Sequence, residues 1–372
     1  MVKRELVRMF CPHVPETVIN KFAETWRSGW IGQGPKVDEF EKEFSKKFGL
    51  KYVVALNSAT SGLRLAYAIA GIGPGDEVIT TPYTMVATNT AILEQFAKPV
   101  FADVQYETAN LDHQDIEHRI TEKTKAIVCV HWGGYPCDLN ELHKIASDHD
   151  LPIIEDAAQS LGAMYKGKPI GSVSNFTVFS LQAIKHITTG DGGMLSVADK
   201  EKYEEALRRR WFGIDRAGRK PSVLGHDPTY DIWEVGYKYH MNDIAATIGL
   251  EQLKSFDSIF LRRAQIAKIY RQELEGVPAI TLLENKNDRV HANWLFAMHV
   301  KRRTKFAEVM HSKGIEVAVH NWRNDKYTIF GGLRKDLPNT EKVDKTLICI
   351  PLHPKLSDED IDYIINSIKE GW

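Results

Sequence analysis

Cysteine is scarce in this sequence: Cys11, Cys129, Cys137 and Cys349 are the only four among 372 residues. They have neither the spacing of zinc ligands nor that of a redox pair, so we expect small core residues in a reducing compartment. The fourteen histidines show no paired spacing with an acidic partner either. We therefore predict no metal site.

Long apolar runs and an excess of charge are also missing. No stretch approaches the length of a membrane span, and the first residues lack the apolar core of a signal peptide. The sequence has 48 basic and 49 acidic side chains, a formal charge of -1, which argues against a nucleic-acid or membrane-surface partner. These absences predict a cytoplasmic protein.

What the sequence does contain is a repeated change from short apolar runs to helical segments over its first 200 residues. This alternation predicts an α/β fold with a mostly parallel sheet, whose ligand sites lie at the carboxyl ends of the strands. The strand candidates are residues 52–56, 77–81, 99–103, 126–130, 152–156 and 175–180, and two of the helices begin near residues 63 and 139.

After residue 200 the alternation stops. A long helical region follows residue 243, then a strand candidate at 294–300, a helix at about 303–313 and a closing helix after Ser357. With 43% hydrophobic residues the chain can form two cores. We place the domain boundary near residue 250, with a large domain at 1–250 and a smaller α/β domain at 251–372.

Lys185 is the first candidate for chemistry, because it lies between a strand-like run and the glycine-rich turn at 190–193. Most lysines are solvated, so Lys185 alone predicts little. Its partly apolar setting would lower the pKa of the amine, as a Schiff-base lysine requires. Asp156 closes the apolar run 152–156. Such a pair suits pyridoxal 5'-phosphate (PLP): the lysine bonds the aldehyde, and the carboxylate keeps the pyridine nitrogen protonated.

A second candidate site is the turn at 57–62, where Ser58, Thr60 and Ser61 stand between a strand and a helix. Backbone N–H groups and hydroxyls at such a turn bind phosphate on the helix dipole. A simple helix N-cap is the alternative, and it would explain one serine better than all three hydroxyl residues.

Together these segments resemble the DegT-like family of PLP-dependent sugar aminotransferases, which belongs to fold type I of the PLP enzymes. The similarity covers nearly the whole chain, and several ordered motifs are specific where any one would be weak. The motifs are GWIGQGPKVDEFE, NSATSGL, TPYTMVAT, EDAAQSLGA, FSLQAIKHITTGDGG, GYKYHMNDIAATIGLEQL and PLHPKLSDEDID.

The resemblance implies a role for each matched position. Lys185 would hold the cofactor as a Schiff base and then carry the proton between the cofactor and the substrate carbon. Asp156 would pair with the pyridine nitrogen, and Gln159 would lie near the 3-hydroxyl group. The phosphate contacts would come from Ala59, Thr60 and Ser180.

Two positions depart from the family pattern. Met85 stands where many members have an aromatic residue on the pyridine ring; a methionine can cover the ring, and Tyr83 is the other candidate for stacking or for a substrate contact. Lys238 and His240 stand where many members have asparagine and arginine. That segment reaches the phosphate of the neighbouring subunit in the family, and Lys238 can still donate to it; a solvated lysine is the alternative.

The resemblance thus implies a homodimer with shared active sites that transfers an amino group from L-glutamate to a keto sugar. The expected acceptor is a nucleotide-linked 4-keto-6-deoxy or 3-keto sugar of surface polysaccharide or amino-sugar biosynthesis, and the cofactor would alternate between PLP and pyridoxamine 5'-phosphate. His320 and Arg323 are predicted substrate contacts, although Arg323 also fits a solvated loop.

Three other functions stay open at this point. The acceptor could be a free keto sugar or an aminocyclitol. A sugar dehydratase on this fold would carry histidine in place of Lys185, so the lysine argues against it. A non-catalytic regulatory protein has no need of the intact set Lys185, Asp156, Ser180 and Gln159.

Overall fold

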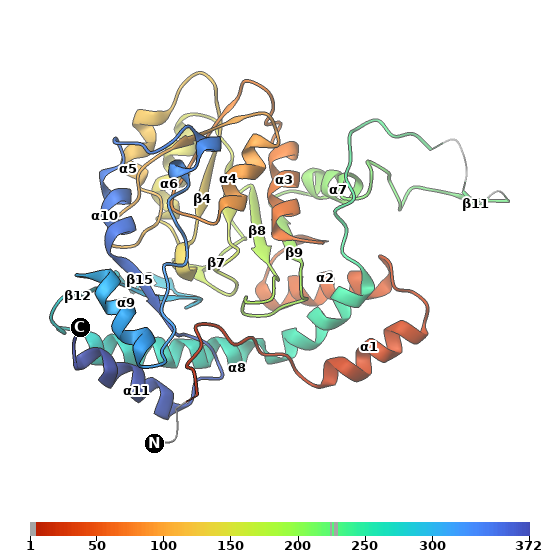
Figure 1. Cartoon of the computed structure of the whole chain (residues 1–372). Coiled ribbons are helices and arrows are strands. Elements are labelled where there is room, and N and C mark those ends of the chain that lie inside the picture. Colours follow the sequence, from red (N-terminus) through yellow and green to blue (C-terminus); the bar gives the residue numbers. More distant parts are fainter. Residues whose placement is uncertain (1–4, 224, 227–229) are drawn as a thin grey trace.

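The computed structural model describes residues 5–223, 225–226 and 230–372, and its centre is a seven-stranded sheet (Figure 1). β9 runs antiparallel to both of its neighbours, and the other pairs are parallel. The carboxyl ends of β1, β8, β5, β4 and β2 therefore share one edge with the amino end of β9. In spatial order the strands are β1 (Tyr52–Leu56), β9 (Gly193–Val197), β8 (Phe176–Ser180), β5 (Ile153–Asp156), β4 (Thr124–Val130), β2 (Glu77–Thr80) and β3 (Lys98–Phe101).

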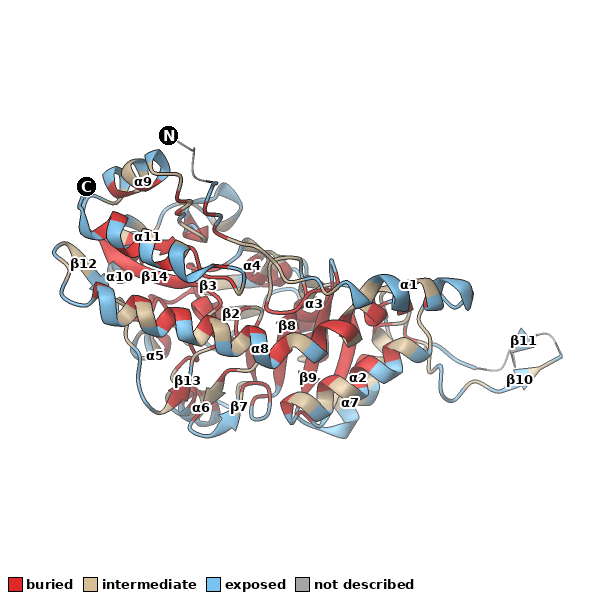
Figure 2. Cartoon of the chain, turned by 90° about the horizontal axis from the view of Figure 1, so that it is seen from below, coloured by how far each residue is buried: buried red, intermediate tan, exposed pale blue. Residues whose placement is uncertain are grey.

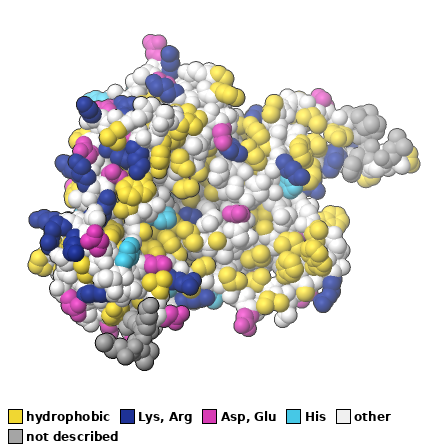
Figure 3. Space-filling model, viewed as in Figure 1, with side chains coloured by type: hydrophobic (Ala, Val, Ile, Leu, Met, Phe, Trp, Pro, Cys, Tyr) yellow, Lys and Arg dark blue, Asp and Glu magenta, His cyan; other side chains and the backbone are white. Residues whose placement is uncertain are grey.

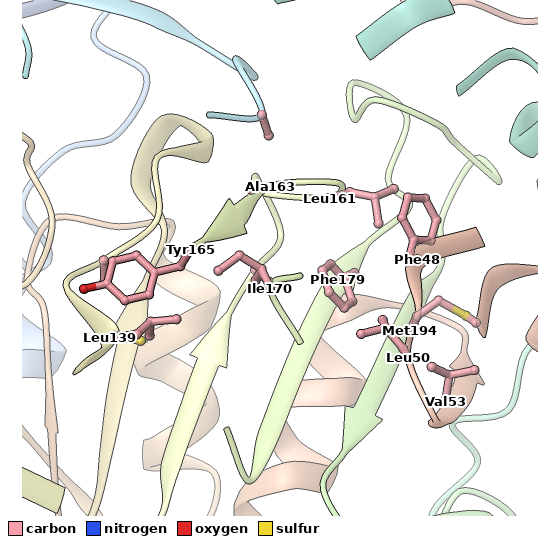
Figure 4. Close-up of a cluster of buried hydrophobic side chains, with 14 of the residues drawn as sticks. Phe48, Leu50, Val53, Leu139, Leu161, Ala163, Tyr165, Ile170, Phe179 and Met194 are labelled. Atoms are coloured by element: carbon pink, nitrogen blue, oxygen red, sulfur yellow. The ribbon is translucent and has the colours of Figure 1, made fainter. Parts of the chain in front are cut away.

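Helices cover both faces of this sheet, as the alternating pattern predicts. Side chains along β1 alternate between the two faces of the sheet, with Val53 and Ala55 on one face and Val54 and Leu56 on the other. Phe179 and Met194 are paired across β8 and β9 and lie beside Phe48 (Figure 4). One face carries α3 (Ala59–Ile69), α4 (Val86–Leu93) and α7 (Lys200–Arg209), and the other carries α2 (Pro35–Phe48), α6 (Leu139–Asp148) and the first half of α8 (Asp243–Leu274).

A second core lies on an antiparallel three-stranded sheet of β12 (Ile280–Leu282), β14 (Phe296–Val300) and β15 (Leu347–Ile350). It is covered by α9 (Arg303–Ser312), α11 (Asp358–Lys369) and the end of α8. α8 contributes Ile259 to the first core and Ile266 to the second, and it is continuous through residue 250. The domain boundary near 250 stays a prediction, and the change of core along the helix lies some residues later.

The remaining elements are short or peripheral. The composition of residues 213–230 predicts a loop, and the described part of this segment projects from the body and contains a small hairpin of β10 and β11 (Figure 1). Figure 2 shows the central strands buried and much of α1 exposed. The short and peripheral elements are α1 (Thr17–Arg27), α5 (His113–Ile116), α10 (Pro338–Thr346), β6 (Met164–Tyr165), β7 (Lys168–Pro169), β10 (Pro221–Ser222), β11 (Gly225–His226), β13 (Arg289–Val290) and the 3-10 turns Glu117–Arg119, Trp132–Gly134, Asn324–Lys326 and Thr328–Phe330.

The described residues lack two kinds of feature. None of their helices combines the length and the apolar character that crossing a membrane requires. They also contain no group of three or more histidine, cysteine, aspartate or glutamate side chains arranged to hold a metal ion.

Candidate active site

The predicted site residues come from neighbouring elements at one edge of the central sheet. Asp156 is the last residue of β5 and Ser180 is the last residue of β8. Ala59 opens α3, directly after the end of β1, and Gly193 is the first residue of β9. Parallel strands bring these ends together because their carboxyl termini face the same way.

Lys185 lies in the loop between β8 and β9, which is closed at its base by backbone hydrogen bonds. The N–H of Leu181 donates to the carbonyl of Gly192, and that of Thr189 donates to the carbonyl of Leu181, both at 2.9 Å. His186 is buried, and its Nε2 donates to the carbonyl of Ala292 at 2.7 Å. The loop is therefore fixed both to the sheet and to the chain before β14.

The surroundings of Lys185 lower the pKa of its amine to about 7. Burial is the main cause, the Asp156 carboxylate opposes it, and the positive charge of Arg263 adds to it. This is the direction that the sequence predicts. An amine with such a pKa both accepts and releases a proton near neutral pH, as a general acid and base must.

Asp156 is 6% exposed and is held by two donors of the same chain. The hydroxyl of Thr88 donates to its Oδ2 at 2.7 Å, and the N–H of Ala158 donates to its Oδ1 at 3.1 Å. The hydroxyl of Thr84 lies 3.0 Å from that of Thr88. Sequence reasoning did not assign Thr88, although the hydroxyl-rich TPYTMVAT segment was the available signal.

Gln159 is also buried at this edge. Its Oε1 accepts a hydrogen bond of 2.6 Å from the N–H of Gly133, in the turn after β4. Within the described part of the chain, its Nε2 has no hydrogen-bond partner. Gln159 therefore still has amide donors available for a ligand.

Beneath the turn at 132–134 lies a buried polar pair. His131 Nε2 is 2.6 Å from Glu155 Oε2, and neither residue is exposed. The N–H of Cys137 donates to His131 Nδ1 at 3.0 Å, so Nδ1 is an acceptor and Nε2 carries the proton that faces Glu155. The hydroxyl of Thr177 donates to Glu155 Oε1 at 3.2 Å.

The turn before α3 has both features that the sequence left as alternatives. Ser58 caps the helix, because its Oγ accepts from the N–H of Ser61 at 3.1 Å, and the Ser61 hydroxyl donates to Asn57 Oδ1 at 2.6 Å. These two hydroxyls are therefore engaged within the turn. In the described residues the N–H groups of Ala59 and Thr60 have no acceptor, as expected in the first turn of a helix.

Gly193 leaves space against this turn. A Cβ atom at Gly193 would lie 2.6 Å from the backbone nitrogen of Ala59 and 2.7 Å from the carbonyl oxygen of Ser58. Only glycine allows this approach. Free N–H groups at the start of α3, the glycine beside them and the helix dipole together fit a phosphate group.

The remaining predicted residues have different surroundings. Met85 precedes α4 and is 56% exposed, whereas Tyr83 is fully buried with its ring 5.7 Å from that of Trp132. Lys238 is exposed, and its carbonyl accepts from the side chain of Asn57 at 3.2 Å.

His320 and Arg323 differ from each other. The ring of His320 lies 4.6 Å from that of Trp294, beside Lys185, and burial followed by the charge of Lys185 lowers its pKa to about 4. Arg323 is buried in a two-pronged ion pair with Asp325, at 2.7 and 2.6 Å. Its guanidinium is thus already engaged within the chain.

The donor set at this edge fits PLP. An amine of lowered pKa, a buried carboxylate, a free amide and a cradle for phosphate lie at the ends of adjacent strands. A scan against family models matches residues 12–369 to the DegT/DnrJ/EryC1/StrS aminotransferase family. The chain belongs to this family.

Two relatives in this family are similar to the chain over nearly their whole length. The spore coat polysaccharide biosynthesis protein SpsC of Bacillus subtilis is 36% identical over 96% of this chain and 95% of its own. The UDP-4-amino-4-deoxy-L-arabinose–oxoglutarate aminotransferase of Shewanella sediminis is 34% identical over 99% of both chains.

A solved structure of a similar protein supports PLP as the cofactor. The PLP form of Spr1654 from Streptococcus pneumoniae superimposes with a TM-score of 0.91 and 32% identity, covering 98% of each chain, and the protein is also known in a pyridoxamine phosphate form. The present chain is accordingly a PLP-dependent aminotransferase with the fold of the sugar aminotransferases.

Proposed function

We propose that this enzyme transfers an amino group from L-glutamate to a nucleotide-linked keto sugar, of the 4-keto-6-deoxy or 3-keto type, for surface polysaccharide or amino-sugar biosynthesis. The observation that carries the proposal is the amine of Lys185, with its pKa near 7, beside Asp156 at the carboxyl edge of the sheet. The relatives named for spore coat polysaccharide and for an oxoglutarate-dependent sugar reaction support the substrate class.

Bound PLP supplies an electron sink that stabilises negative charge on the substrate carbon. In our proposal Lys185 Nζ takes the proton from the donor's carbon and passes it to the cofactor, and it moves a proton in the opposite direction when the acceptor is aminated. Asp156, oriented by Thr88, would pair with the pyridine nitrogen, and Gln159 would donate its amide to the 3-hydroxyl group. The free N–H groups of Ala59 and Thr60, with the hydroxyl of Ser180, hold the phosphate.

We also propose residues that contact the cofactor ring and the substrate. Met85 is exposed at the start of α4, which suits a side chain that covers a bound ring, whereas buried Tyr83 is the other candidate for stacking or for a substrate contact. His320 remains the better candidate for the sugar, because Arg323 already pairs with Asp325.

We also propose a homodimer with shared active sites. α1 exposes Ile19, Phe22 and Trp26, which lie on one helical face, and Figure 3 shows hydrophobic side chains gathered where α1 runs. Lys238 is exposed near the turn before α3, which suits a donor to the phosphate of a second copy. Sedimentation should give a dimer that Phe22→Asp with Trp26→Asp dissociates; an unchanged dimer would exclude this face.

The function is tested by the absorption spectrum of the holoenzyme with L-glutamate alone. Loss of the visible cofactor band with release of 2-oxoglutarate is the expected result, and Lys185→Ala should remain folded without this reaction. A visible band that ignores glutamate would exclude glutamate as the donor. Keto-sugar nucleotides added to the glutamate-treated enzyme should then restore the band, and failure of all of them would refute the acceptor class.

A further inference from the structure

A buried tryptophan lies directly against the catalytic amine. Lys185 Nζ is 3.7 Å from the centre of the Trp294 ring, and Trp294 is not exposed at all. The contact joins the loop after β8 to the chain just before β14. The sequence predicts a strand that begins at Trp294, but β14 begins at Phe296, so Trp294 lies outside the sheet.

The indole is fixed at several points. Its Nε1 donates to the carbonyl of Ile184 at 3.0 Å, so the ring is bonded to the residue that precedes the lysine. The backbone N–H of Trp294 donates to Gly133 at 3.0 Å, and its carbonyl accepts from Arg263 at 3.1 Å. The ring therefore has one position relative to Lys185.

In the ranges that the structure describes, no acidic side chain pairs with Lys185 Nζ, which forms neither an ion pair nor a hydrogen bond. The charged groups that act on it are Asp156 on β5 and Arg263 on α8. The nearby imidazoles are neutral at pH 7, since burial lowers the pKa of His186 to about 3 and that of His320 to about 4.

This arrangement meets a requirement of the reaction. Lys185 must leave the cofactor during the first half-reaction and return in the second, and a free lysine side chain has many rotamers. A carboxylate partner would hold the ammonium but raise its pKa and impede release of the proton. An indole face attracts the cation and accepts no proton.

We propose that Trp294 is a positioning residue whose indole face holds the ammonium of Lys185 by a cation–π contact whenever the lysine is not bonded to the cofactor. This inference rests on the role proposed above for Lys185. It does not depend on the donor or on the sugar.

The test uses holoenzyme loaded with pyridoxamine 5'-phosphate, in which Lys185 is free and no substrate is needed. Competitive labelling with a trace acetylating reagent, followed by mass spectrometry, gives the pKa of Lys185. Trp294→Phe and Trp294→Leu leave cavities of similar size, but only phenylalanine keeps an aromatic face. We expect the leucine variant to titrate about half a pH unit below the phenylalanine variant.

Phe10→Leu is the matched control, because Phe10 stacks on Trp294 at 5.7 Å and the change leaves the indole in place. The Phe10→Leu variant should have the same pKa at Lys185 as the wild type. Equal pKa values in the two Trp294 variants, or an equal shift in Phe10→Leu, would overturn the proposal.

Fluorinated tryptophan provides a second measurement that does not depend on the folding of a leucine variant. Fluorine withdraws charge from the ring face with little change of volume, so fluorinated wild-type enzyme should show a lower pKa for Lys185 with each added fluorine. Fluorinated Trp294→Phe keeps every other tryptophan and should show no shift. An equal shift in both proteins, or none in the wild type, would refute the contact.

Discussion

Replacing Thr88 by valine removes one hydroxyl from behind Asp156 and changes the side-chain volume very little. Thr88 is completely buried, and its hydroxyl supplies the shorter of the two hydrogen bonds to the carboxylate, at 2.7 Å. A hydrogen bond to a charged group contributes about 1.5–3 kcal/mol. If the variant loses this much stabilisation of the transition state, kcat falls roughly 10- to 150-fold.

Part of the loss should appear in the free energy of unfolding, because Asp156 Oδ2 then lacks the hydrogen bond that the Thr88 hydroxyl donates. Urea unfolding of the cofactor-free protein would show that part, and single-turnover kinetics with glutamate would show the rest. Thr88→Ser keeps the hydroxyl and should stay within about 0.5–1 kcal/mol of the wild type in both assays. A valine variant with wild-type stability and wild-type kcat would refute the role of Thr88 in orienting Asp156.

Three further predictions concern the rest of the site. Gly193→Ala should weaken PLP binding at least about tenfold in equilibrium dialysis, because its Cβ would displace the N–H of Ala59. Gly73→Ala is the control for glycine replacement, because Gly73 lies away from this turn, has no positive φ and has open space where a Cβ would lie. Unaltered PLP affinity in Gly193→Ala would exclude the cradle. Glu155→Ala should lower the free energy of unfolding by about 1–3 kcal/mol, since it leaves the Nε2–H of buried His131 without an acceptor. Thr177→Val should cost only about 0.5–1.5 kcal/mol, and equal losses in urea would contradict the pair. The amine of Lys185 binds its proton less tightly in the folded, cofactor-free protein, with a pKa of about 7, than in the unfolded chain, so the free energy of unfolding should rise with pH between about 7 and about 10, and a Lys185→Met variant with the same rise would refute this.

Six of the seven strands of the central sheet and their common edge could be predicted because each of these strands is a local apolar run, whereas β9 is not among the predicted strands. Asp156 closes such a run, and the rule for parallel strands then brings it near the loop of Lys185. The direction of β9 could not be predicted, because an apolar strand has the same pattern whether it pairs parallel or antiparallel. That direction is what brings Gly193 against Ala59.

The supporting residues of the site were harder to predict for a different reason. Thr88 and Trp294 act on residues far away in the sequence, so no local spacing connects them to Asp156 or Lys185. Arg323 shows the opposite case. A segment dense in polar side chains predicts a substrate contact, but only the fold shows that Asp325 already binds this arginine.

Lys185 and Gln159, two members of the proposed site, are both held by one short segment, residues 291–295. The backbone of Trp294 and Leu295 donates to Gly133, the residue whose N–H holds Gln159. The carbonyl of Ala292 accepts from His186, and the indole of Trp294 contacts Lys185. A displacement of this segment would therefore move the amine and the amide of Gln159 together. Arg263, on the α8 helix that joins the two cores, bonds the same segment and fixes its position.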